Sequence, residues 1–297
     1  MKQYFLFAAV ALMLPACNND ESNVQSPDTI RLTATVEGST TRATLTATQA
    51  QDTQFDDGQN IHVDVFETGG TTRYSSGTYR TTDADGTMSG TLKYPSGGEA
   101  VDIEAYYPST VAYNTETFRV QTTQTTYGNY QASDLMYASV ENKSKGSTHS
   151  LTFHHALTKI VVNLTADASI DDASLTKLTS VTINGTKTTA NITKGAWTSA
   201  GGSVESIDIT GTTKLGSHVG IIVPQTVAAG TTFITVVYNG KTLPYKIPAM
   251  PVTGKNFAPG NQYTYTFNIT MSGISLKSEE MVTGWTPNTV PNEDLIL

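Results

Sequence analysis

The sequence predicts an all-β protein, and three observations support this fold class. Charged residues make up only 15% of the 297 positions, while threonine, serine and glycine are abundant, as is typical of extracellular β-rich proteins. Short stretches of alternating apolar and polar residues recur between turn dipeptides. No segment has a convincing helical period over more than a turn or two. Because the chain is long enough for two cores, we expect two β-sandwiches in series.

The N-terminus has the three parts of a secretory signal. Lys2 supplies a charge, residues 4–14 are apolar, and small residues lead to Cys17. The apolar run is too short to cross a membrane as a helix. Cys17 is the single cysteine and cannot form an internal disulfide, so its position at the end of this run indicates lipidation. We expect a signal peptide at residues 1–16 and a flexible polar tether at residues 17–28.

Residues 29–37 (TIRLTATVE) form the predicted first strand, around which the chain is organised. Apolar side chains alternate with polar ones there, which predicts one buried face. The buried row would be Ile30, Leu32, Ala34 and Val36. Burial of each larger member contributes roughly 1.5–3 kcal/mol. Loss of the strand would leave an apolar groove with unpaired backbone groups, which another extended segment could enter.

Residues 38–43 form the predicted loop after this strand. Small and hydroxylated residues precede one arginine, Arg42, which is followed by Ala43. An exposed loop of this composition suits cleavage by a trypsin-like protease. The alternative is an ordinary first strand with an ordinary loop behind it, and these residues alone leave both interpretations open.

The N-terminal sandwich is expected over residues 29–145. The polar stretch at residues 139–150 places the domain boundary at 145–146. Pro108 ends the last clear strand before this boundary. Strands are predicted at residues 61–66, 74–79 and 101–107, and residues 118–130 suit a loop or an exposed strand.

The C-terminal sandwich is expected over residues 146–273. Asn184-Gly185 and Asn239-Gly240 each lie between strand-like runs, and both dipeptides favour type I′ hairpin turns because their residues accept positive φ. Residues 263–271 alternate throughout and predict a strand with two distinct faces. Residues 274–297 form a C-terminal strand and an apolar-ended tail.

Several function classes are disfavoured by the sequence. The formal net charge of -8 and the pI near 5.1 argue against nucleic-acid binding. His154 and His155 are adjacent in a predicted strand and would point to opposite faces, so we expect no metal site there. Asp102 and Glu104 share a strand face without any sign of a cleft, and no catalytic motif is present. We therefore expect neither an enzyme nor a cofactor.

A series of sequence motifs runs along the chain. They are LPAC, the strand at residues 30–36 with TTRA behind it, DDGQNIHVDVF, YPSGGEAVDIEAYYP, SDLMYA followed by LTFHHALTKIVV, and VTGWTPN. In order and spacing, these motifs resemble those of the fimbrillin family, the subunits of type V pili, over nearly the whole chain. Phe55 stands where family members often have tryptophan.

The resemblance implies two tandem transthyretin-like β-sandwich domains in a surface-exposed outer-membrane lipoprotein, acylated (palmitate) at Cys17. An arginine-specific protease would cut between Arg42 and Ala43 and release the first strand. The cleaved subunit would then join other subunits, copies or paralogues, in an adhesive fimbrium by donor-strand exchange.

In this family the incoming strand comes from the C-terminal region of a neighbour, so residues 274–297 are the candidate donor. Its groove-filling side chains would be Ile274, Leu276, Met281 and Trp285. An anchor subunit would keep its first strand and a tip subunit would lack a donor, so we expect a shaft subunit rather than a tip. The alternative from another class is a monomeric carbohydrate-binding surface lipoprotein.

Overall fold

The computed structural model describes residues 28–37, 54–83, 86–167, 170, 177–249, 253–270 and 273–285. Across these ranges the regular structure is β-strand, apart from one six-residue helix, α1 (Tyr127–Ala132). The predicted all-β class is confirmed.

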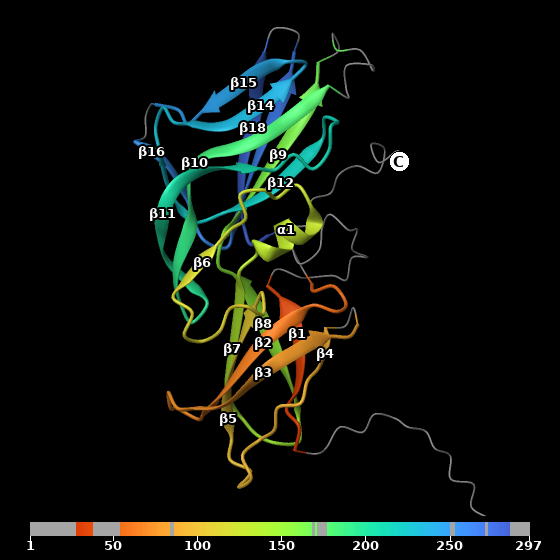
Figure 1. The fold of residues 1–297 in the computed structure, drawn as a ribbon, viewed down its shortest axis with the longest axis vertical. Helices are drawn as coiled ribbons and strands as arrows, with labels where there is room; N and C mark the ends of the chain where they lie inside the picture. Colours follow the sequence, from red (N-terminus) through yellow and green to blue (C-terminus); the bar gives the residue numbers. More distant parts are fainter. Residues whose placement is uncertain are drawn as a thin grey trace, which may run out of the picture.

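Seven strands form a closed barrel in the order β1-β4-β3-β2-β5-β7-β8, which occupies the lower part of Figure 1. The predicted alternation of β2 and β5 places Val63 and Ile103 in its apolar interior. The strands are β1 Arg31–Val36, β2 Asn60–Glu67, β3 Arg73–Thr81, β4 Thr87–Ser89, β5 Val101–Tyr107, β7 Met136–Lys143 and β8 Thr148–His155.

The barrel differs from the β-sandwich that the sequence predicts for this half, because its sheet has no free edge. Strand β1 pairs in parallel with β8 on one side and antiparallel with β4 on the other. It is therefore the strand that closes the sheet and satisfies the edge groups of both neighbours. The transthyretin-like arrangement of two tandem domains remains a prediction.

The other strands form two larger sheets and one small sheet in the upper part of Figure 1. One large sheet has the order β11-β10-β14-β15, with β6 pairing β10; the other has the order β12-β9-β17-β18; and β13 pairs with β16. The strands are β6 Thr117–Arg119, β9 Thr158–Ala166, β10 Leu178–Thr193, β11 Ala196–Asp208, β12 Ser217–Ile222, β13 Gln225–Ala228, β14 Thr232–Tyr238, β15 Lys241–Lys246, β16 Gly254–Phe257, β17 Asn261–Ile269 and β18 Ile274–Thr283. Phe233 and Tyr265, from the two large sheets, lie with ring centroids 5.7 Å apart in a shared core.

The two apolar clusters do not divide at the predicted boundary, residues 145–146. That point lies in the turn between β7 and β8, and both strands belong to the barrel. Phe153 of β8 lies in the barrel cluster, whereas Phe118 and Val120, which precede β7, lie in the second cluster. The chain thus enters the second core, returns to the barrel, and then leaves it again.

One of the two predicted Asn-Gly hairpins forms. Asn239 and Gly240 have φ of 48° and 71° and connect β14 to β15, as a type I′ turn requires. Asn184-Gly185 instead lies inside β10, where Gly185 alone of the pair has positive φ and the register against β11 shifts. The second dipeptide therefore forms a β-bulge, because β10 has partner strands that continue past it.

Candidate functional site

The N-terminal strand β1 lies in a slot between β4 and β8. It pairs with β8 along its whole length and with β4 at Leu32 and Thr33. The predicted buried row is confirmed. Ile30, Leu32, Ala34 and Val36 are 0%, 1%, 4% and 2% exposed.

The slot has an apolar floor. The buried row of β1 belongs to the same cluster as Ile61 of β2, Met88 of β4, and Leu151 and Phe153 of β8. The ring of Phe153 also contacts Phe55, with centroids 4.9 Å apart. Without an extended segment in the position of β1, these apolar side chains would be exposed to solvent.

Buried polar contacts fix the backbone of β1. The Tyr79 hydroxyl donates to the carbonyl oxygen of Ile30 at 2.7 Å, and burial raises the pKa of this hydroxyl, so it stays a donor. The backbone N–H of Ala34 donates to the carbonyl of Gly86 at 2.8 Å. Gly86 has φ of 77°, and a Cβ there would lie 2.0 Å from the Ala34 oxygen, so the approach requires glycine.

Polar side chains pair at both ends of the slot. At its start Asp28 forms an ion pair with Lys145, and the hydrogen bond and charge of this lysine hold the pKa of the Asp28 carboxyl below its ordinary value. At its far end Glu37 Oε2 lies 2.5 Å from Nδ1 of His154. These pairs are exposed, so they define the position of β1 more than they stabilise it.

The predicted processing residues lie outside the described part of the chain. The described residues run to Glu37 and resume at position 54, so Cys17, Arg42 and Ala43 have no structural account here. Arg42 follows Glu37 by five positions in the sequence. Lipidation and cleavage therefore stay predictions.

The candidate donor segment starts with the edge strand β18. This strand pairs with β17 and, within the described ranges, has no strand on its other side. Leu276 and Met281 are 39% and 54% exposed, and Ile274 is partly buried against the second core. Apolar side chains on an unpaired edge are typical of a surface that contacts another chain.

The fourth candidate donor residue, Trp285, is buried within its own chain. It is 1% exposed, and its ring stacks on His155 with centroids 3.7 Å apart and an interplanar angle of 11°. Nδ1 of His155 lies 2.9 Å from Oδ1 of Asp134, and Nζ of Lys159 lies 5.9 Å from the Trp285 ring centroid. Sequence reasoning missed this cluster, because no local pattern connects residues so far apart.

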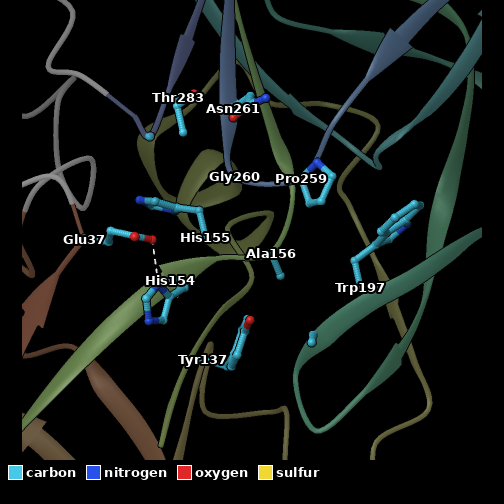
Figure 2. A pocket seen from close by; sticks show the side chains of 12 residues that line it. Glu37, Tyr137, His154, His155, Ala156, Trp197, Pro259, Gly260, Asn261 and Thr283 are labelled. Atoms are coloured by element: carbon cyan, nitrogen blue, oxygen red, sulfur yellow. Dashed lines mark hydrogen bonds and ion pairs between the residues drawn. The ribbon is translucent and has the colours of Figure 1, made fainter.

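A pocket of about 580 Å³ lies where β1 and β18 end, as Figure 2 shows. Strands β7, β8, β11, β17 and β18 all contribute to its walls. Its lining includes Tyr137, His154, His155, Trp197, Asn261 and Thr283. The sequence does not predict it, since these residues meet only through the long-range pairing of the strands.

The two acidic residues of β5 that the sequence brings to one strand face, Asp102 and Glu104, make contacts that stabilise the fold. Asp102 accepts hydrogen bonds from the backbone N–H groups of Gly69 and Asn142, and Glu104 pairs with Lys194 at 2.9 Å. Within the described residues, no three His, Cys, Asp or Glu side chains are arranged to hold a metal ion. In the same part of the chain, no helix is both long and apolar enough to cross a bilayer.

The comparison with protein families decides what kind of protein this is. The model described as fimbrillin-like matches residues 23–285. The chain belongs to the fimbrillin-like family. Members of this family are structural pilus or adhesion proteins, so the fimbrillin-like chain is not an enzyme. The family also indicates a location at the cell surface or in a fimbrium.

Solved structures share the fold of this fimbrillin-like chain. A proposed cell-adhesion protein from Bacteroides uniformis is 22% identical with a TM-score of 0.65, covering 87% of this chain and 98% of its own. A second one, from Bacteroides ovatus, is 18% identical with a TM-score of 0.66, covering 88% and 99%.

The tip fimbrial protein Mfa3 from Porphyromonas gingivalis, with a C-terminal truncation, is 9% identical with a TM-score of 0.55, covering 86% of this chain and 99% of its own. At these identities the likeness concerns the fold. No curated protein matches the chain significantly.

Proposed function

We propose that this chain is a shaft subunit of a type V pilus, exported as a lipoprotein acylated at Cys17, cut between Arg42 and Ala43, and polymerised by donor-strand exchange. Membership of the fimbrillin-like family supports a pilus or adhesion role. The proposed cleavage and the proposed donor-strand exchange are argued from the way in which β1 lies between β4 and β8.

One observation carries the proposal: β8 depends on β1 for its pairing. Residues 148–153 of β8 pair with β1, while β7 pairs only with His154 and His155. Loss of β1 would therefore leave six consecutive residues of β8 as an unpaired strand beside an apolar floor. An extended segment from a neighbouring subunit satisfies both the backbone and the pockets.

The energetics make replacement necessary. Burial of Ile30, Leu32 and Val36 contributes roughly 5–9 kcal/mol in total at 1.5–3 kcal/mol for each side chain. This is comparable with the whole stability of an ordinary domain, about 5–15 kcal/mol. A cleaved subunit that loses this strand is marginal until a new strand fills the slot.

The C-terminal segment supplies the replacement in this proposal. Leu276 and Met281 remain exposed on β18 while the subunit is free, so little burial is lost when they move into a neighbour. Trp285 differs, because its transfer would break the stack on His155. A contact that inserts the tail of one subunit into the slot of the next does not close on itself and yields a filament.

A tip subunit and a monomeric carbohydrate-binding lipoprotein are the competing assignments. The tip role needs no donor, whereas the exposed apolar residues of β18 fit donation. The monomeric lipoprotein would keep β1 in its surface form, with acylated Cys17 and no chain beginning at Ala43.

The test is the Arg42→Ala variant, expressed in cells that assemble the filament. We expect it to be exported and to remain a monomer with β1 attached, as shown by mass spectrometry of the mature N-terminus and by native gel electrophoresis. Arg119→Ala, which removes an exposed arginine of β6, is the control and should polymerise normally. Normal filaments from Arg42→Ala would refute the processing step.

Deletion of the residues after Met271 tests the donor separately. The deleted chain should still be cut after Arg42 but should not polymerise with itself. Unimpaired polymers of the cleaved, deleted chain would remove the donor assignment while leaving the slot intact.

A further inference from the structure

The pocket at the ends of β1 and β18 has the size of a ligand-binding site. Its volume of about 580 Å³ lies within the range of about 300–1,000 Å³ that small-molecule sites occupy. Strands of the barrel and of both large sheets form its walls, so the pocket is built by the fold as a whole rather than by one loop.

The lining combines aromatic rings with polar groups. Figure 2 shows Tyr137 and His154 on one side of the hollow, Trp197 on the opposite side, and Asn261 and Thr283 at a third side. Tyr and Trp present an apolar ring with a polar handle, which suits ligands that are apolar on one face and hydroxylated at the edge. A purely apolar ligand would leave the polar side chains without partners.

Two buried polar atoms of the lining have no partner among the described residues. They are Nε1 of Trp197 and Nε2 of His155. The indole N–H needs an acceptor. Nδ1 of His155 faces the Asp134 carboxylate at 2.9 Å, so Nε2, the other ring nitrogen, is the atom that needs a partner. Hydroxyl groups meet both needs, since each can donate and accept.

The charge of the described lining disfavours strongly ionic ligands. Its charged residue Glu37 pairs with His154 at 2.5 Å, and none of the described residues that line the pocket is a lysine or an arginine. Phosphates and carboxylates favour sites with Arg or Lys, whereas this pocket offers rings, an amide and hydroxyls. We propose that the pocket binds a neutral saccharide unit, with one sugar face against the aromatic rings and its hydroxyls at Trp197, His155 and Asn261.

The chain carries its own reporter for this site. It contains two tryptophans; Trp197 lines the pocket, and Trp285 stacks on the pocket residue His155. The uncleaved chain is titrated with the methyl glycosides of glucose, galactose, mannose and N-acetylglucosamine. We expect a saturable change of tryptophan emission with at least one of them, and saturation-transfer NMR signals from the same sugar.

Variants assign the binding to this pocket. Trp197→Phe keeps an aromatic ring and loses the N–H, so it should weaken binding about 3- to 10-fold; saturation-transfer NMR measures it. Tyr137→Ala should weaken it further. The matched control is Tyr74→Ala, which removes an exposed tyrosine of β3 outside the pocket lining and should bind as the unaltered chain does.

Three results would overturn the proposal. The first is the absence of a saturable response to all four glycosides, and the second is equal affinity of the unaltered and Trp197→Phe chains. The third is a change of tryptophan emission with a peptide of the sequence of residues 286–297 and with none of the glycosides, which would identify a chain segment as the occupant. None of these results bears on cleavage or strand exchange, which are tested by polymer formation.

Discussion

The hydroxyl of Tyr79 and the carbonyl oxygen of Ile30 lie 2.7 Å apart inside the barrel, where the Tyr79 side chain is 1% exposed. A side chain of β3 thus holds the backbone of β1 from within the core. Because the contact is to a carbonyl group, any strand that replaces β1 in the same register can make it.

Tyr79→Phe should destabilise the uncleaved chain by about 1–3 kcal/mol, because the buried Ile30 carbonyl loses its donor. Urea unfolding followed by circular dichroism measures this. Tyr74→Phe changes an exposed tyrosine of the same strand and should stay within about 0.5 kcal/mol of the unaltered chain. Equal effects of the two changes would contradict the role of the hydroxyl.

Leu32→Ala should lower the stability of the uncleaved chain by about 2–5 kcal/mol, because it leaves a cavity in the slot. After cleavage and assembly the same substitution should have no effect on the filament, since β1 has left. Thermal unfolding of the monomer and of the filament gives both values. Thr35→Ser, on the exposed side of β1, is the control. A filament destabilised by Leu32→Ala would mean that β1 remains in place.

Gly86→Ala should destabilise the uncleaved chain by about 1–3 kcal/mol, since φ of 77° is strained for alanine and its Cβ would meet the Ala34 carbonyl. Gly98→Ala provides the matched control. Gly98 also has positive φ, 79°, but its Cβ would meet nothing within 4 Å. The difference between the two variants, measured by chemical denaturation, isolates the close approach to β1. No difference would argue against that approach.

Trp285→Ala should cost about 3–5 kcal/mol, because a fully buried ring stacked on His155 is removed. Met281→Ala, on exposed β18, should change stability by less than about 1 kcal/mol and should instead slow polymerisation. Denaturation and light scattering separate the two effects. A stable Trp285→Ala chain would contradict the anchoring of the C-terminal segment at this residue.

Acidification from pH 7 towards pH 5 should destabilise the uncleaved chain. Burial, together with the charge of Lys143, lowers the pKa of His149, which lies opposite Leu32 and 2.6 Å from the Tyr94 hydroxyl. Burial also lowers the pKa of His218. For a lowered histidine pKa, the contribution to stability is fully present above the ordinary value of 6.5 and is lost as pH falls through the folded-state pKa.

Replacement of either histidine should reduce this pH dependence. Denaturation of His149→Gln, His218→Gln and the unaltered chain at a series of pH values checks the expectation. If both changes left the slope of stability against pH unaltered, the assignment to these two rings would be wrong.

The strand β1 illustrates what the sequence can predict. Apolar and polar residues alternate strictly along this short segment, so the two-residue period of a strand is enough to predict which side chains are buried. The closure of the barrel does not, because pairing of β1 with β8 joins residues more than a hundred positions apart. The same limit hid the stack of His155 on Trp285 and the pocket beside it.

The Asn-Gly dipeptides illustrate a second limit. Both have the local chemistry of a type I′ turn, yet Asn184-Gly185 lies in the long strand β10, whose pairing with β11 and β14 outweighs the turn preference. The sequence does not predict helix α1 either, since its six residues, YGNYQA, are too few to show a helical period; its Thr126 cap is its one local signal.

The most direct test of the central claim is hydrogen exchange of residues 148–153 of β8, which pair with β1 and with no other described strand. We predict slow exchange in the uncleaved monomer, fast exchange once the arginine-cleaved monomer has lost β1, and slow exchange again in the filament, whose mass spectrum contains no β1. Slow exchange in a cleaved monomer that has lost β1, or the presence of β1 in the filament, would contradict the account.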